Sequence, residues 1–365
     1  MAVNKKNTPP IRGERQSNFE ALRLLSMLMV LNLHSFGGFN YGSGIWQALD
    51  FFRESTSICA VDCFILISGY FGIKWKFRSF FNLIFQIFFY SVGLYLVVVG
   101  LGIVDWSLKE FIIRFGCLFT RSWGFAITFV LLYFCSPVLN AFADRSSSRE
   151  LLLYIIVFFI VINFVSIPRF DLFTYALVYL VGRWLRKMNV ADLKFPSGKA
   201  YWIVTVLIFV IVYVLCFCVL HFTKSNVLKW PFGIIGYNYA APLVILQAVF
   251  LFMFFARLSF KSKFVNWCAA SSFAIYLIHM HPTIKQIGYY AFTKSLYEQP
   301  PFLHVVALVA FILAVFFACI FIDKIRIATS NVCFLMVESL VKYVPVKLLK
   351  IETYLPSSMA VLISK

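Results

Sequence analysis

Long apolar stretches dominate the chain, and they restrict its fold more than any other feature. A helix needs about 20 apolar residues to cross roughly 30 Å of hydrocarbon, and ten segments meet or approach that length. They are 18–37, 54–72, 79–103, 123–143, 150–167, 171–187, 201–221, 237–257, 264–283 and 302–323. With 62% hydrophobic and 13% charged residues, a soluble domain could not bury this much apolar surface. The sequence therefore predicts an all-α, polytopic integral membrane protein with about ten transmembrane helices.

Basic residues between these stretches predict the orientation. If the N-terminus is cytoplasmic, 23 Lys and Arg residues fall in inner segments and 9 in outer loops, with Arg23 alone inside a span. This asymmetry fits the positive-inside rule, so we expect both termini in the cytoplasm. The expected regions are a polar cytoplasmic N-terminus (1–17), a membrane domain (18–323) and a basic, amphipathic cytoplasmic tail (324–365). The net charge of +18 then reflects topology and not nucleic-acid binding.

The first predicted span carries titratable side chains, which are costly in lipid and need an explanation. Arg23 and His34 are separated by 11 positions, about 16 Å and almost three helical turns, so they project from nearly the same face. A guanidinium suits phosphate binding, and an imidazole can remove a proton from a hydroxyl near neutral pH. Taken singly, each residue has an alternative: Arg23 could simply pair with Glu20, and His34 could be a buried, hydrogen-bonded imidazole.

Five motifs follow one another along the chain. The first is the Arg-x10-His pair of Arg23 and His34. The others are Val61-Asp-Cys-Phe-Ile-Leu-Ile-Ser68-Gly69-Tyr70-Phe71-Gly-Ile-Lys74, Trp123-Gly-Phe125 continuing through Leu132-Tyr133 to Ser136-Pro137-Val-Leu-Asn140, Tyr179-Leu-Val-Gly182, and Ser271-Ser-Phe-Ala-Ile-Tyr276-Leu-Ile-His279. Together they resemble the membrane acyltransferase 3 family, whose members O-acylate sugars and other cell-surface acceptors. The resemblance covers residues 18 to 323 and is greatest to members found with capsule or lipopolysaccharide gene sets.

This resemblance implies a bacterial surface-polysaccharide O-acetyltransferase in the inner (plasma) membrane. Its donor substrate would be acetyl-CoA or another acyl-CoA, with no permanently bound cofactor. The acceptor would be a glycan or its lipid-linked precursor. The family often has an Arg-x-x-Arg pair at the start of the third span, whereas here the chain reads Lys74-Trp-Lys76-Phe-Arg78. Arg23, Lys76 and Arg78 are the candidates for binding the phosphate-rich donor head, with topological anchoring as the alternative for the last two.

His34 is the candidate general base for direct transfer of the acyl group, with a covalent acyl-enzyme as the variant. Asp62 would orient His34 if the two side chains touch, although the sequence favours a capping or water-cavity role for this carboxylate. On the acceptor side, His279 is a second imidazole or part of a cavity wall, and Trp123 could stack on a sugar ring. Ser68, Gly69 and Tyr70 lack a nucleophile elbow, so we expect close helix packing there.

No His, Asp, Glu or Cys cluster has metal-ligand spacing, so no metal site is expected. The expected partners are acyl-CoA, the sugar acceptor and membrane lipid. A transporter or flippase for a lipid-linked sugar is an alternative, because it would also need about ten spans, internal cations and aromatic grooves. A noncatalytic membrane scaffold is a third possibility, in which neither Arg23 nor His34 matters beyond folding.

Overall fold

The computed structural model describes residues 16–35, 44–120, 123–164, 171–189, 198–222 and 239–341, without side chains at 171, 216–222 and 330–341. These residues are 85% helical and contain no strand. The predicted all-α class is therefore confirmed for this part of the chain. The predicted N-terminal region 1–17 and the end of the predicted tail lie almost entirely outside the described residues.

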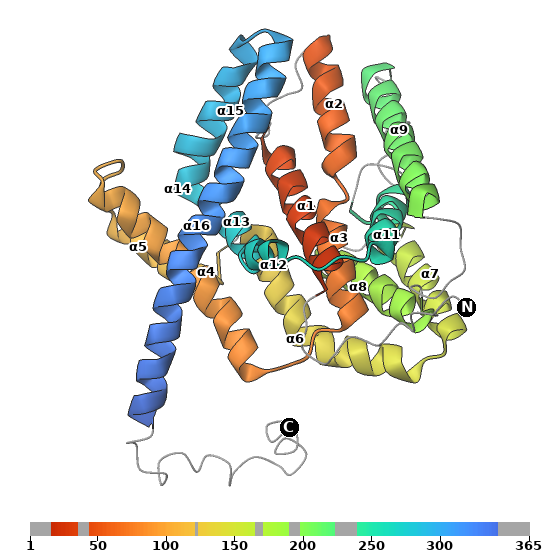
Figure 1. Cartoon of the computed structure of the whole chain (residues 1–365), viewed down its shortest axis with the longest axis horizontal. Helices are drawn as coiled ribbons and strands as arrows, with labels where there is room; N and C mark the ends of the chain where they lie inside the picture. Colours follow the sequence, from red (N-terminus) through yellow and green to blue (C-terminus); the bar gives the residue numbers. More distant parts are fainter. Residues whose placement is uncertain are drawn as a thin grey trace, which may run out of the picture. The chain divides into compact units, whose positions relative to one another are not determined.

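The described helices follow the apolar pattern of the sequence (Figure 1). The first group is α1 (Ser17–His34), α2 (Ile45–Ser57), α3 (Ala60–Phe71), α4 (Phe77–Gly100), α5 (Leu108–Phe115), α6 (Gly124–Arg145), α7 (Ser148–Phe164), α8 (Asp171–Lys187) and α9 (Gly198–Phe222). The second group is α11 (Pro242–Arg257), α12 (Lys263–Ala269), α13 (Ser272–His279), α14 (Pro282–Ile284), the π-helix η3 (Lys285–Tyr290), α15 (Ala291–Ser295), the 3-10 helix η4 (Leu296–Glu298) and α16 (Pro301–Val341).

Four of the described helices are long and apolar enough to cross a membrane. They are Phe77–Gly100, Gly124–Arg145, Gly198–Leu215 and Pro301–Thr329, and Pro242–Arg257 is a shorter apolar helix. Long apolar helices with large exposed hydrophobic side chains are typical of a membrane protein. The expected number of about ten spans and the orientation of the termini stay predictions.

Two predicted spans are each divided in the structure. The segment 54–72 contains the end of α2 and all of α3, and 264–283 contains α12 and α13 separated by a short turn. The first break is stable because other helices satisfy carbonyl groups at the buried end of α2. Asn32 of α1 donates to the Arg53 carbonyl at 3.3 Å, and Gln247 of α11 donates to the Ser55 carbonyl at 2.9 Å. Hydropathy alone does not predict these hydrogen bonds, because their donors lie on other helices.

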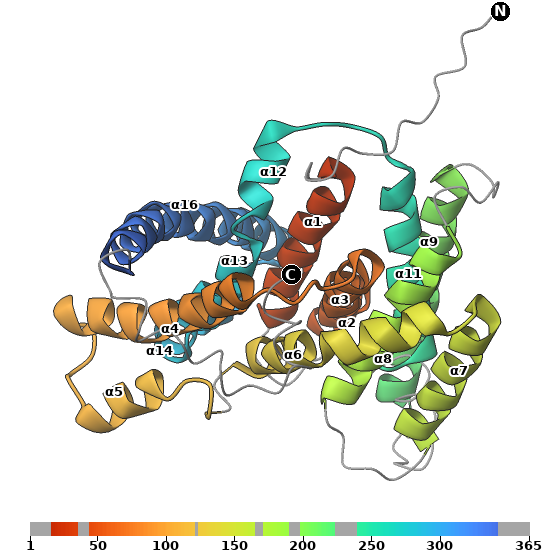
Figure 2. The ribbon, with the colours of Figure 1, turned by 90° about the horizontal axis from the view of Figure 1, so that it is seen from below.

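Helices α1 and α3 lie among α6, α8, α11, α12 and α13, as seen in Figure 2. Glycines allow α3 and α8 to approach backbone to backbone. A Cβ atom at Gly69 would lie 2.2 Å from the carbonyl oxygen of Tyr179, and one at Gly182 would lie 2.6 Å from that of Leu66. Small residues of this kind permit close helix contact in membranes, so the packing role predicted for Gly69 is confirmed.

Pro137 interrupts the hydrogen-bond ladder of α6, which bends along its length in Figure 1. The carbonyl of Tyr133 loses its usual backbone donor there, and the Ser136 hydroxyl donates to it at 2.7 Å instead.

The chain divides into two compact units, Met1–Cys319 and Ile320–Lys365. The boundary lies within α16, which begins at Pro301 and continues to Val341. The helix therefore passes through residue 324, where the sequence analysis placed the start of a separate tail. The site described below belongs entirely to the first unit.

Candidate functional site

His34 ends α1 and lines a chamber of about 250 Å³. The chamber is lined by residues of α1, α3, α6, α8 and α13 and by Tyr239. Its lining residues are Met27, Val30, Leu33, His34, Val61, Phe64, Gly124, Phe125, Tyr175, Tyr239 and Tyr276. The positions of Met27, Val30 and His34 follow helical spacing, and Arg23 is the preceding position on this stripe. The chamber therefore extends along the face of α1 that the sequence singled out, although Arg23 itself does not line it.

A pair of imidazoles forms one side of this site. Nδ1 of His34 lies 2.9 Å from Nε2 of His279, and Nδ1 of His279 lies 2.6 Å from the carbonyl oxygen of Ile275. A carbonyl can only accept a hydrogen bond, so Nδ1 of neutral His279 carries the proton and its Nε2 has a lone pair. Nδ1–H of His34 therefore donates to His279. This arrangement leaves Nε2 of His34 unprotonated, as a general base requires.

The turn that carries His34 is held by side chains from other helices. Tyr289 of η3 donates its hydroxyl to the Leu31 carbonyl at 2.6 Å. Arg53 of α2 donates to the Ser35 hydroxyl and, at 3.3 Å, to Oδ1 of Asn32. These bonds satisfy polar groups at the end of α1 and restrict the position of His34.

Arg53 also belongs to a buried ionic network. Its Nη1 lies 2.9 Å from Oδ1 of Asp50, and the Tyr297 hydroxyl donates to the same oxygen at 2.7 Å. Burial raises the pKa of Asp50, while the hydrogen bond from Tyr297 and the charge of Arg53 partly offset this increase. Burial also raises the pKa of the Tyr297 phenol. In the predicted topology Arg53 is one of the nine basic residues of the outer loops. The three-residue spacing of Asp50 and Arg53 is the signal that could have indicated a pair.

A family model described as an acyltransferase domain, acyltransferase 3, matches residues 16–322. The chain belongs to the acyltransferase 3 family. No match to a curated protein or to a solved structure was found. The family match and the apolar helices together establish a membrane-associated acyltransferase. During acyl transfer to a hydroxyl the acceptor must lose a proton, and an unprotonated imidazole nitrogen is able to accept it.

Asp62 is not the hydrogen-bond partner of His34 Nδ1. It is 1% exposed in α3, no hydrogen bond connects it to His34, and its Oδ2 atom has no partner among the described residues. The partner of His34 Nδ1 is His279, which the sequence predicts as a second imidazole on the acceptor side or as part of a cavity wall.

Trp123 is 1% exposed, and its indole N–H donates to the Met280 carbonyl at 3.0 Å. Its ring lies beside His281, with 6.0 Å between the ring centroids. A ring this buried has no face open for a sugar, so the stacking role predicted for Trp123 does not fit its position. Trp123 instead connects the start of α6 to the end of α13. Its neighbours Gly124 and Phe125 are the residues of this motif that reach the chamber.

The three predicted donor-binding cations lie on α1 and at the start of α4. Arg23 pairs with Glu20 at 3.0 Å while its side chain stays 30% exposed, so the simple pairing considered from the sequence does occur. The side chains of Lys76 and Arg78 are exposed. They therefore remain accessible to an anionic ligand.

The backbone of the α3–α4 loop beside these cations is fixed by three side chains. The amide of Asn140 donates to the Ile73 carbonyl at 2.8 Å, and the amide N–H of Ile73 donates to the Tyr179 hydroxyl at 2.8 Å. The Tyr133 hydroxyl donates to the Lys74 carbonyl at 3.2 Å. The loop is thus held while its cationic side chains extend outward.

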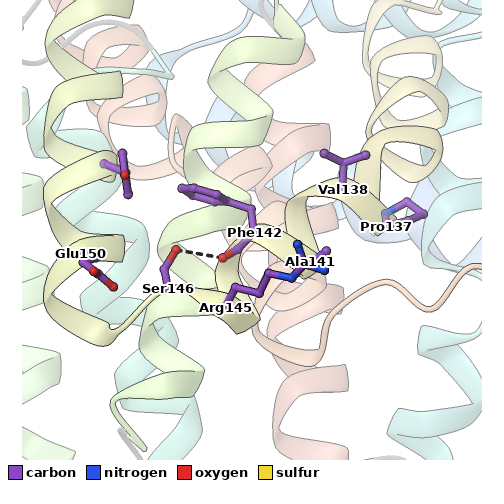
Figure 3. Close-up of a pocket in the computed structure, with 8 residues that line it drawn as sticks. Pro137, Val138, Ala141, Phe142, Arg145, Ser146 and Glu150 are labelled. Atoms are coloured by element: carbon purple, nitrogen blue, oxygen red, sulfur yellow. Dashed lines mark hydrogen bonds between the residues drawn. The ribbon is translucent and has the colours of Figure 1, made fainter.

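Two larger grooves are less suited to the chemistry. A groove of about 630 Å³ between α6 and α7 has Arg145 and Glu150 on an otherwise largely apolar wall, as Figure 3 shows, and its described lining residues include no histidine. Another, of about 570 Å³, has His279 on its wall beside η3 and α16. Neither is lined by His34, so neither offers its free Nε2 atom to a substrate. In the part of the chain with described side chains, no group of three or more metal-binding side chains occurs.

Proposed function

We propose that this acyltransferase transfers acetyl from acetyl-CoA to a hydroxyl of a bacterial surface polysaccharide or of its lipid-linked precursor, in the plasma membrane. The observation that carries the proposal is a chain of two hydrogen bonds, in which His34 donates to His279 and His279 donates to the Ile275 carbonyl. This chain of bonds leaves Nε2 of His34 as the proton acceptor at the chamber. The family match supports acyl transfer, and nothing favours the transporter or flippase alternative.

In the proposed reaction, Nε2 of His34 removes the proton from the acceptor hydroxyl. The oxygen attacks the thioester carbonyl, and the tetrahedral intermediate collapses as the carbon–sulfur bond breaks. The proton passes from the imidazolium to the departing thiolate, so coenzyme A leaves as a thiol. His279 stabilises the transient cation because its Nε2 accepts the Nδ1–H bond of His34.

The donor is proposed to place its phosphates near Arg23, Lys76 and Arg78, with its thin arm directed along α1. The distance from Arg23 to His34 is about 16 Å along the helix, which an extended pantetheine arm can span. Exposed cations suit a phosphate-rich head, and the apolar stripe of Met27 and Val30 suits the arm.

The test compares surface glycans from a deletion strain complemented with the wild type, His34→Ala or His281→Ala. His281 is the control, since it is a buried histidine bonded to the Ser91 carbonyl and does not line the chamber. We expect O-acetyl esters with the wild type and His281→Ala, and a loss of at least 100-fold with His34→Ala. Normal ester content with His34→Ala, at equal amounts of membrane-inserted protein, would refute the proposal.

A further inference from the structure

The chamber beside His34 is mostly apolar, and this limits what it can hold. Met27, Val30 and Leu33 line it from α1, Val61 and Phe64 from α3, and Phe125 from α6. Apart from His34, the polar side chains among its described lining residues are the phenols of three tyrosines. A sugar ring would bring several hydroxyls to walls with few partners, and each buried hydroxyl without a partner is costly. An acyl group makes no such demand.

The volume of the chamber sets a second limit. At about 30 Å³ for each water-sized group, 250 Å³ holds about eight non-hydrogen atoms. The acetylated end of coenzyme A consists of a methyl, the carbonyl carbon and oxygen, sulfur, two methylenes and an amide nitrogen. That end, with seven non-hydrogen atoms, nearly fills this volume, so each further methylene needs room beyond it.

From the proposed donor chemistry, we infer that this chamber is the acyl-binding site and that Phe125 restricts the donor to short acyl groups. The Phe125 ring forms part of the wall and packs against Tyr276, Tyr175 and Phe64, with ring centroids 5.0, 5.9 and 6.3 Å away. These aromatic contacts fix the ring in place, so the wall does not yield easily to a longer chain.

A larger side chain at Gly124 should make the chamber smaller, whereas removal of the Phe125 ring should make it larger. Gly124 lines the chamber, and a Cβ atom at this position would meet no heavy atom of the described residues within 4 Å. A larger side chain therefore enters open space and reduces the room for a substrate without a clash with the protein. Gly93 of α4 has the same open surroundings but does not line the chamber, which makes it the matched control.

The experiment measures kcat/KM for acetyl-, propionyl-, butyryl- and hexanoyl-CoA, from thiol release with membranes of the deletion strain as acceptor. Phe125→Ala should raise kcat/KM for butyryl-CoA and hexanoyl-CoA relative to that for acetyl-CoA by about tenfold or more, because a difference of one methylene in an apolar pocket changes kcat/KM by about this factor. Gly124→Val should lower kcat/KM for propionyl-CoA relative to that for acetyl-CoA by about tenfold. Gly93→Val should leave the ratios of kcat/KM unchanged, since Gly93 does not line the chamber.

The inference fails if Phe125→Ala and Gly124→Val still transfer acetyl but keep the wild-type chain-length ratios. It also fails if they change only the KM for the acceptor, which would place the acceptor in the chamber. If Phe125→Ala does not fold, Gly124→Val decides alone, since its site has open space. The proposed function has a separate failure, which is the absence of acetyl transfer by the wild type.

Discussion

Replacing His279 tests whether the imidazole pair controls the base. In His279→Ala, Nδ1–H of His34 loses its acceptor, and the tautomer with a free Nε2 is no longer favoured. Leaving a buried donor without a partner costs about 1–3 kcal/mol. Since about 1.4 kcal/mol corresponds to a tenfold rate change, kcat should fall about 5- to 150-fold. The KM for acetyl-CoA should change less than about twofold, because His279 does not line the chamber.

His279→Gln provides a rescue, because the glutamine amide oxygen can accept the hydrogen bond from Nδ1 of His34. We expect it to recover most of the activity lost in His279→Ala. His281→Ala is the control for general loss of a buried histidine, and it should lower stability without changing kcat.

The assay follows thiol release from acetyl-CoA in proteoliposomes, normalised to the folded protein found by size-exclusion chromatography. Equal kcat values for the wild type and His279→Ala would refute the orienting role. A rescue by glutamine no better than alanine would refute the acceptor role of the residue at position 279.

Three further substitutions test other parts of the structure. Gly69→Ala should prevent close packing of α3 on α8 and destabilise the protein by about 3 kcal/mol or more, whereas Gly93→Ala should not. Thermal unfolding in detergent measures this difference, and equal unfolding temperatures for the two variants would contradict the packing. Arg53→Met should lower the free energy of unfolding by about 3–5 kcal/mol, because it leaves Asp50 buried without its ion pair. Arg114→Met should lower it less, because the partner of Arg114, Glu110, is 43% exposed. A similar loss of stability in both variants would argue against the buried network. Asp62→Asn should change kcat less than about threefold in the thiol-release assay, and a loss above tenfold would restore Asp62 as an orienting group.

The helical class could be predicted from sequence because apolar length is a local property. The segment 79–103 corresponds to α4 and 123–143 to α6, with boundaries within a few residues. The divided segments 54–72 and 264–283 were missed for the opposite reason. In 54–72 the break depends on side chains from distant helices, Asn32 and Gln247, that donate to carbonyls at the end of α2.

The candidate site shows the same division. Motif spacing indicated His34, and helical periodicity placed Arg23 on the same stripe. Asp62 was considered for a role that its contacts do not support, and the burial of Trp123 leaves no open face for the predicted stacking. Arg53 was missed as a site residue because a charge in an outer loop is usually solvated, whereas here it is 8% exposed within an ionic network.

The sequence by itself determined the membrane-helical character and the family, because hydropathy and the order of the motifs can be read directly from the amino-acid sequence. Only the tertiary structure decided which group orients His34, since His279 is 245 positions away and becomes its neighbour only when α13 packs on α1. The tautomer of the base follows from that contact and from the Ile275 carbonyl behind it. A hydrogen bond of this kind depends on separations of about 3 Å, which spacing along the chain does not specify.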